Sequence, residues 1–148
     1  MSCPTNEQLG QTILVRYSLQ CDETTKPVDF VLLGGVTNRE FGTSITSVDV
    51  TTEQDMSKIG GAKSFDPTIS GFYRTATADN FAALDAWIDE EDNPAGWLQF
   101  EMPSAAGTVV LKSIPVLFTG IPVTGTTNEA VTFNLTSESR GKLIREVV

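Results

Sequence analysis

The sequence contains no histidine and only two cysteines, Cys3 and Cys21. Without histidine, the chain lacks the usual general base and the Ser-His or Cys-His pairs that activate a nucleophile. A structural zinc site draws its four ligands mainly from cysteine and histidine, so two cysteines do not complete one. Two thiols in a chain without an export signal are expected to stay reduced. We therefore predict a protein that is not an enzyme and has no catalytic residues, metal or cofactor.

Long hydrophobic runs and positive charge are scarce as well. No segment approaches the roughly 20 apolar residues that span a bilayer, and residues 1–10 resemble no secretory signal. The chain has 10 Lys and Arg against 19 Asp and Glu, a net charge of −9. Because tight binding to nucleic acid or anionic membranes relies on basic residues, we expect neither. We expect synthesis in a cytoplasm, with solubility as the simplest explanation of the acidic excess.

What the sequence does have is the composition of a single globular domain. Its 148 residues are 40% hydrophobic and 20% charged, enough for a core without metal or disulfide support. Seven segments show alternating or β-type apolar patterns and are predicted strands: 12–19, 28–36, 44–51, 62–74, 98–102, 108–121 and 130–137. Residues 38–42 ("NREFG") are predicted to form a bend. Pro115 interrupts one strand and marks an edge, a bulge or a bend.

One helix is predicted, over residues 77–91. Thr77 or Asp79 is the expected N-cap, and Phe81, Leu84 and Ile88 form an apolar stripe with Trp87 at its margin. One helix among mostly antiparallel strands predicts a mainly β protein. The expected fold is an antiparallel β-sandwich or partly open barrel with one flanking α-helix.

Three segments do not fit this core. Residues 52–63 are too many for a tight hairpin and too polar for a core, so we predict a long loop there. The N-terminal residues 1–10 and the C-terminal residues 138–148 have weak periodicity, and we interpret both as arms. Segments of this kind are typical of chains that complete their packing against a partner.

Two motifs leave alternatives open. The acidic run Asp89–Asp92 lacks the spacing of a calcium loop, so we interpret it as a solvated or partner-facing patch. Trp87 and Trp97 have the side chains of a sugar-binding platform, but each also fits an apolar stripe. A monomeric carbohydrate-binding β-sandwich is therefore a second interpretation.

Three stretches carry a resemblance to a known family: "GGVTNREFGTSITSVDVTTEQD" (34–55), "GAKSFDPTISGFY" (61–73) and "FTGIPVTGTTNEAVTFNLTSESRGK" (118–142). In this order they resemble the tail tube (major tail) proteins of long-tailed bacteriophages, or siphophages. That family is related in fold to the tube proteins of type VI secretion, which remain an alternative. The resemblance covers most of residues 10–141.

The resemblance implies a structural virion protein that assembles with itself. In the family, β-sandwich subunits form hexameric rings, and their inner sheets join into one barrel. The rings stack into a tube that conducts double-stranded DNA without tight binding during genome ejection. Other partners would be the tape measure protein, the tail terminator and the baseplate or tip. An acidic channel wall would repel phosphates at close range, which gives the net charge a second interpretation.

The resemblance also assigns roles to the segments outside the core. The long connection would contact the next ring through Thr52, Glu53, Gln54, Asp55, Met56, Ser57, Lys58, Ile59 and Lys63, with Lys58 and Lys63 as partners for acids there. The two arms would bind adjacent subunits through Leu9, Arg140, Lys142, Leu143 and Ile144.

Overall fold

The computed structural model describes residues 13–51, 56–104 and 107–148, with only the backbone path described over 48–51 and 56–62. The described part contains eleven strands, one 3-10 turn and one α-helix. The strands are β1 (Leu14–Ser18), β2 (Val31–Leu32), β3 (Val36–Glu40), β4 (Ser44–Thr51), β5 (Met56–Ser64), β6 (Thr68–Phe72), β7 (Ala95–Pro103), β8 (Val109–Gly120), β9 (Val123–Thr124), β10 (Thr132–Ser139) and β11 (Ile144–Val147). The helix α1 spans Phe81–Glu90.

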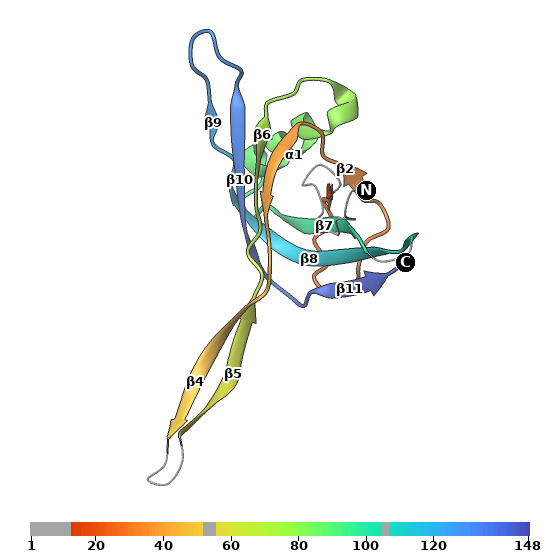
Figure 1. Cartoon of the computed structure of the whole chain (residues 1–148). Coiled ribbons are helices and arrows are strands. Elements are labelled where there is room, and N and C mark those ends of the chain that lie inside the picture. Colours follow the sequence, from red (N-terminus) through yellow and green to blue (C-terminus); the bar gives the residue numbers. More distant parts are fainter. Residues whose placement is uncertain (1–12, 52–55, 105–106) are drawn as a thin grey trace, which may run out of the picture.

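Nine strands form one antiparallel sheet in the order β2-β1-β7-β8-β10-β6-β3, with β11 paired to β8 and β9 paired to β10. The sheet curves but does not close into a barrel. Figure 1 shows β10, β6 and β3 standing on one side while β7, β8 and β11 cross behind them. The predicted mainly β, antiparallel fold with one flanking helix is confirmed.

The core lies inside the curve of this sheet. It consists of buried side chains from the two halves of the curved sheet, from their connections and from the helix: Val15, Tyr17, Leu33, Phe65, Ile69, Phe81, Leu84, Leu98, Phe100, Ile114, Val116, Phe118, Ile121, Phe133 and Leu135. The helix α1 covers the end of this core that faces away from the β4–β5 hairpin (Figure 1). Beyond the helix, the connection between β9 and β10 projects furthest from the hairpin.

The apolar stripe of α1 is confirmed, but its start is not where the sequence predicts. Phe81 and Leu84 are buried, and Trp87 and Ile88 pack against the core. Thr77–Asp79 is a separate 3-10 turn, and the N-cap is Asn80 in the left-handed conformation at φ 59°. The predicted caps Thr77 and Asp79 are wrong because tertiary contacts select Asn80. Its carbonyl accepts the Tyr17 hydroxyl at 2.5 Å and its amide donates to the Leu32 carbonyl at 2.7 Å.

The single strand predicted over 28–36 is wrong. The structure has the short β2, a break, and then β3, which includes most of the predicted bend at 38–42. Gly35 adopts φ +78° and turns the chain between them. The opposing Gly71 packs so closely that a Cβ there would lie 2.2 Å from the Gly35 carbonyl oxygen. The close approach of two backbones explains both glycines.

The polar loop predicted over 52–63 is also wrong from Met56 onward. Met56–Ser64 is strand β5, paired antiparallel with β4, whereas 52–55 lie outside the described residues. The register places Val48 opposite Ile59 and Asp49 opposite Lys58. Gly60 and Gly61 have low strand propensity, which hides this strand in the sequence. The strand predicted over 62–74 is correspondingly divided between β5 and β6.

The predicted C-terminal arm, 138–148, belongs to the subunit's own sheet. Strand β10 continues to Ser139, and β11 pairs with β8 from Ile144 opposite Ser113 to Val147 opposite Val110. The last residue exchanges two backbone hydrogen bonds with Val109, at 2.9 and 3.0 Å. The arm prediction is therefore wrong here, and the N-terminal arm, 1–10, lies outside the described residues.

Pro115 explains why β10 and β11 are separate. Its carbonyl accepts the backbone N–H of Arg140 at 2.9 Å, and its nitrogen, on the same side of β8, has no hydrogen to donate. The chain leaves β8 at this point and returns as β11. Gly141 makes the crossing, because a Cβ there would lie 2.6 Å from the Pro115 ring. Pro115 thus lies in mid-sheet, at the gap between two neighbouring strands.

Phe133→Asp should prevent folding, whereas Val131→Asp should leave a folded domain. Phe133 is 2% exposed and its ring lies 4.7 Å from that of Phe81, so an unpaired carboxylate would be buried there. Val131 precedes β10 and is 39% exposed, which corrects its sequence-based assignment to the core. Near-ultraviolet circular dichroism and amide NMR dispersion distinguish the two variants. A native spectrum from Phe133→Asp would contradict this core.

Candidate assembly surfaces

The most prominent surface is the β4–β5 hairpin, which continues β3 and β6 away from the main sheet (Figure 1). Its strands pair with each other and with no other strand in the described part of the chain. An isolated two-stranded hairpin is only marginally stable in water. Both of its edges carry backbone groups ready to pair with another chain. The hairpin therefore presents a surface that a partner would complete.

Three aromatic rings root this hairpin in the core. Phe41 lies in the short connection between β3 and β4, and Phe65 directly follows the end of β5. The Phe41 ring stacks on Phe100, with centroids 4.2 Å apart and planes at 17°, and Phe65 lies 6.1 Å from both. Phe100 and Phe65 are buried, and Phe41 is half-buried. The base of the hairpin is thus fixed by rings on both of its strands.

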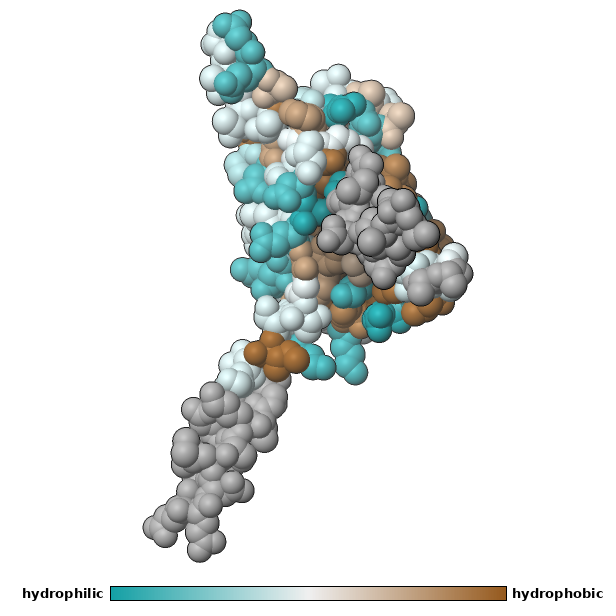
Figure 2. Space-filling model, in the orientation of Figure 1, coloured by the Kyte–Doolittle hydropathy of each residue, from teal (hydrophilic) through white to brown (hydrophobic). Residues whose placement is uncertain are grey.

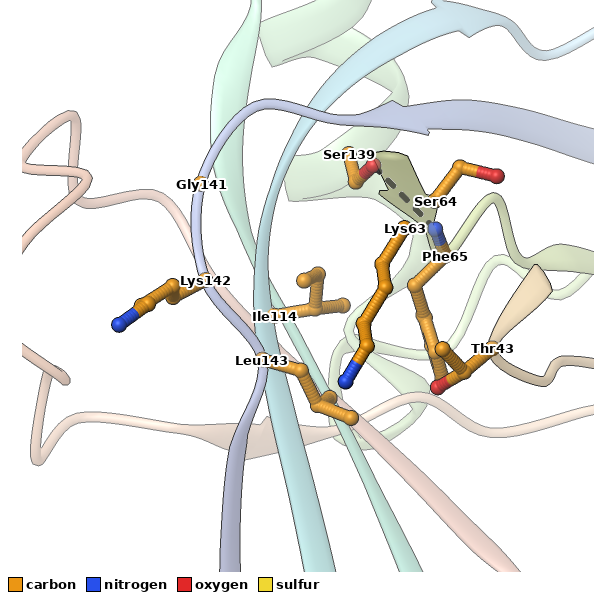
Figure 3. A pocket seen from close by; sticks show the side chains of 9 residues that line it. All are labelled: Thr43, Lys63, Ser64, Phe65, Ile114, Ser139, Gly141, Lys142 and Leu143. Atoms are coloured by element: carbon orange, nitrogen blue, oxygen red, sulfur yellow. Dashed lines mark hydrogen bonds between the residues drawn. The ribbon is translucent and has the colours of Figure 1, made fainter. Parts of the chain in front are cut away.

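Beside this base lies a hollow of about 470 Å³ (Figure 3). It is lined by Thr43, Lys63, Ser64, Phe65, Ile114, Ser139, Gly141, Lys142 and Leu143. Phe65, Ile114 and Leu143 supply apolar surface, while Lys63 extends past Leu143 and Lys142 points outward. Both lysines are exposed, and neither forms an ion pair with a described residue. We call these nine residues the basic hollow.

The acidic run at the end of α1 lies on the surface. Asp89, Glu90, Glu91 and Asp92 are all exposed, as the sequence analysis expected, and we call them the acidic cluster. Burial, and then the charge of Asp89, raise the pKa of Asp85 above its usual range. None of the four acids pairs with a cation among the residues that the structure describes. Within that part, no group of three or more acidic or thiol side chains is placed to hold a metal ion.

The convex face of β9, β10, β6 and β3 has a different chemistry. Along β10, Thr132, Asn134 and Thr136 alternate with buried Phe133 and Leu135. The outward positions continue across the paired strands as Thr124, Phe72, Ser70, Thr68 and Glu40, with Glu138 further along β10. Among these described outward positions there is no Lys or Arg. Figure 2 shows mostly teal and white surface along this side. We call it the hydroxyl face.

The two tryptophans pack within the subunit. Trp97 is fully buried and its indole N–H donates to the Asp22 carbonyl at 2.6 Å. Trp87 packs against the core and donates to the Ala95 carbonyl at 3.1 Å. Of the two interpretations, packing is confirmed for Trp97. A sugar cannot stack on a ring that has no exposed surface, so Trp97 is not a carbohydrate platform.

The structure separates the residues predicted to make contacts between subunits. Arg140 binds its own subunit, since it donates to the Cys21 carbonyl and lies 3.7 Å from Glu23. Leu143 packs on the core and Ile144 pairs within the sheet, which leaves Lys142 exposed at the basic hollow. Residues Met56–Ile59 lie on β5 and Lys63 at its base, while Leu9 and Thr52–Asp55 lie outside the described residues.

Sequence reasoning missed the anchoring role of Phe41 and the hydroxyl face. The signal for Phe41 was present: one aromatic residue lies just before the long connection and another, Phe65, just after it. The hydroxyl face is also visible as alternating Thr, Ser and Asn in two predicted strands. In the part of the chain that is described, no helix combines the length and apolar character of a transmembrane span.

Phe41→Ala should loosen the hairpin and lower the free energy of unfolding by about 2 kcal/mol, less than for a fully buried phenylalanine. Urea unfolding measures the stability loss, and hydrogen exchange should show faster exchange in β4 and β5. Phe72→Ala is the matched control because Phe72 is 41% exposed on the hydroxyl face, and it should change stability by less than about 1 kcal/mol. Equal effects of the two substitutions would contradict the anchor.

The comparisons with known proteins agree in architecture. No model of a known protein family and no curated protein matches the sequence. Among solved structures, the tail of an empty gene transfer agent particle, refined with C6 helical symmetry, matches with a TM-score of 0.70 and 21% identity, over 95% of this chain and 99% of that one. The tube-terminating cap of the anti-feeding prophage matches with a TM-score of 0.65 and 12% identity, over 100% of this chain and 96% of that one.

The SPP1 tail tube matches with a TM-score of 0.63 and 13% identity, over 93% of this chain and 78% of that one. The three similar chains come from the tail of a particle, a tube-terminating cap and a tail tube, and each aligns with nearly the whole of this chain. The resemblance to tail tube proteins is thus confirmed at the level of the fold, because this chain shares its fold with the SPP1 tail tube and with the other two chains.

Proposed function

We propose that this protein is the structural subunit of a tail tube, in which hexameric rings stack into a conduit for DNA ejection. The observation that carries the proposal is the β4–β5 hairpin, which is rooted by aromatic rings yet pairs with no other described strand of its subunit. The shared fold with the gene transfer agent tail, which has C6 symmetry, supports the number six. In this role the protein has no catalytic step.

Ring formation uses the open edges of the curved sheet. The sheet ends at β2 and β3, and unpaired strand edges favour pairing with another chain. When every copy binds the next through two different surfaces, the contact closes into a ring or continues as a filament. Six curved sheets joined edge to edge would form one continuous wall. The proposed tube therefore needs no element beyond those that the subunit already exposes.

The hydroxyl face is the surface that would line the channel. Thr132, Asn134 and Thr136 offer hydroxyl and amide groups, and Glu40 and Glu138 supply the nearby charges. Acids act on a phosphate only within a Debye length, about 8 Å at physiological salt. A wall without Lys or Arg releases no condensed counterions from DNA and so does not bind it tightly. Double-stranded DNA would slide along this face without adhering.

The hairpin would bridge successive rings. Its tip, Thr52–Asp55, and the following residues Met56–Ile59 are our proposed contacts with the next ring, and Leu9 on the N-terminal segment is a proposed contact between subunits. At the particle level, the partners would be the tape measure protein, the tail terminator and the baseplate or tip. The location is the virion tail, after synthesis in the host cytoplasm.

A second candidate is the tube of a contractile injection system or a type VI-like secretion tube. The likeness to the anti-feeding prophage cap, which covers the whole of this chain, favours it. The two candidates differ in what surrounds the tube, because a contractile system adds a sheath. Purified particles that carry a contractile sheath around this protein would support the second candidate.

The concentrated pure protein should form rings or rods with a central channel under electron microscopy. A variant in which residues 48–59 are replaced by Asn-Gly should remain folded but no longer stack. In that variant a two-residue turn joins Ser47 and Gly60, which are cross-strand partners. Sedimentation measures assembly, and circular dichroism verifies folding. Normal rods from the shortened variant would exclude the hairpin as the bridge, and a wild-type protein that stays monomeric at all concentrations would overturn the tube.

Asn134→Lys combined with Thr136→Lys should leave tubes that retain DNA. Both side chains face outward from β10, so the substitutions add cations to the proposed channel wall without disturbing the core. Assembled tubes would be incubated with short duplex DNA, and co-sedimentation should rise at low salt and fall at high salt. Ala82→Lys combined with Ala83→Lys adds the same charge on the exposed surface of α1. Equal DNA retention by both variants would contradict our assignment of the channel wall.

A further inference from the structure

We propose that the basic hollow of one copy binds the acidic cluster of a second copy in the adjoining ring. This inference rests on the proposed tube and names a contact within it. The contact pairs Lys63 and Lys142 with the carboxylates of Asp89–Asp92. It adds a second bridge between rings, separate from the hairpin tip.

Three described cations of the chain form ion pairs within the subunit, whereas the two lysines of the hollow do not. Arg16 lies 3.5 Å from Glu101, Lys26 lies 2.5 Å from Glu146, and Arg140 lies 3.7 Å from Glu23. Lys63 and Lys142 have no such partner among the described residues, although they approach one hollow from different segments of the chain. Figure 3 shows Lys63 along the hollow and Lys142 on its rim. Two unpaired cations beside a concave surface favour an acidic occupant.

The acidic cluster is placed where its own helix does not stabilise it. The C-terminus of a helix carries partial negative charge, which favours cations and disfavours carboxylates. The last turn of α1 contains no basic residue, and Glu91 and Asp92 extend the negative run beyond it. Burial, and to a smaller extent the charge of Asp89, raise the pKa of Asp85, which lies about one turn before the cluster. A cation from outside the subunit would relieve this repulsion.

The arrangement of the molecule makes the second copy the natural occupant. The basic hollow lies at the base of the hairpin, while α1 covers the opposite end of the core (Figure 1). When copies stack head to tail, the hairpin end of one meets the helix end of the next. Because the two surfaces are different parts of the subunit, the contact is head-to-tail and can repeat along a stack of rings. Complementary charge across such a contact selects the correct partner and register.

Charge reversal and charge exchange test this contact in the full-length protein. Lys63→Glu with Lys142→Glu should raise the concentration needed for assembly by about tenfold or more, and so should Glu90→Lys with Glu91→Lys, since each turns attraction into repulsion. The chain that carries all four substitutions should assemble within about threefold of the wild-type concentration, because complementarity is restored. Sedimentation measures assembly, and circular dichroism verifies that each variant is folded.

Two controls isolate the proposed pair. Lys112→Glu reverses a half-buried cation outside the hollow, on β8, and Glu129→Lys reverses an exposed acid outside the cluster. Both should assemble within about threefold of wild type. If Glu129→Lys blocks assembly while the cluster variant does not, another acid fills the hollow and the inference is overturned. If the four-substitution chain assembles no better than its two parents, the inference is also overturned.

Cross-linking gives a second, independent readout. With Cys3 and Cys21 replaced by serine, a chain carrying Lys142→Cys and Glu91→Cys should form covalent oligomers when assembled tubes are treated with a short bismaleimide. The chain carrying Lys112→Cys and Glu91→Cys should not. If wild-type tubes form normally, the charge variants assemble like wild type and no cross-link appears, the proposed contact is wrong and the proposed tube still stands. A wild-type protein that never assembles would remove the tube itself, and this contact with it.

Discussion

The stacking of Phe41 on Phe100, with Phe65 beside them, is the contact on which the assembly surfaces depend. A projecting two-stranded hairpin gains little from its own pairing, so its direction is set at its base. Two of the three rings belong to residues that flank the hairpin, and the third belongs to the central strand β7. The same rings that complete the core therefore also fix the direction in which the hairpin projects. The Phe65 side chain lines the basic hollow as well, so the hollow and the hairpin share one support.

The sequence predicts the class of fold well where one face of a strand is buried. The β10 segment is an example, because Phe133 and Leu135 alternate with polar residues and only one register hides both. Prediction fails where the backbone, not the side chains, determines the structure. The hairpin strand β5 contains Gly60 and Gly61, and the break between β2 and β3 depends on the left-handed Gly35. Neither hydrophobic period nor propensity reports such features.

The assembly surfaces could be predicted only in part, for a related reason. A polar contact with a second copy produces no periodic pattern of apolar residues in the sequence. The acidic cluster therefore cannot be distinguished in the sequence from an ordinary solvated helix end. In the proposed contact its partners are two lysines that lie 26 or more residues away in the chain and approach each other only in the fold, at a hollow formed partly by the β10–β11 crossing. The sequence does not predict β11 within the expected C-terminal arm, because a strand of four residues is too short to show a clear periodicity.

Pro115 separates the two strands that pair with the same side of β8, so that β10 and β11 are bonded to different parts of it. Because the two strands pair with different parts of β8, opening of β11 does not have to propagate into β10. A substitution that disturbs the pairing of β11 is thus expected to leave the strands of the hydroxyl face in place.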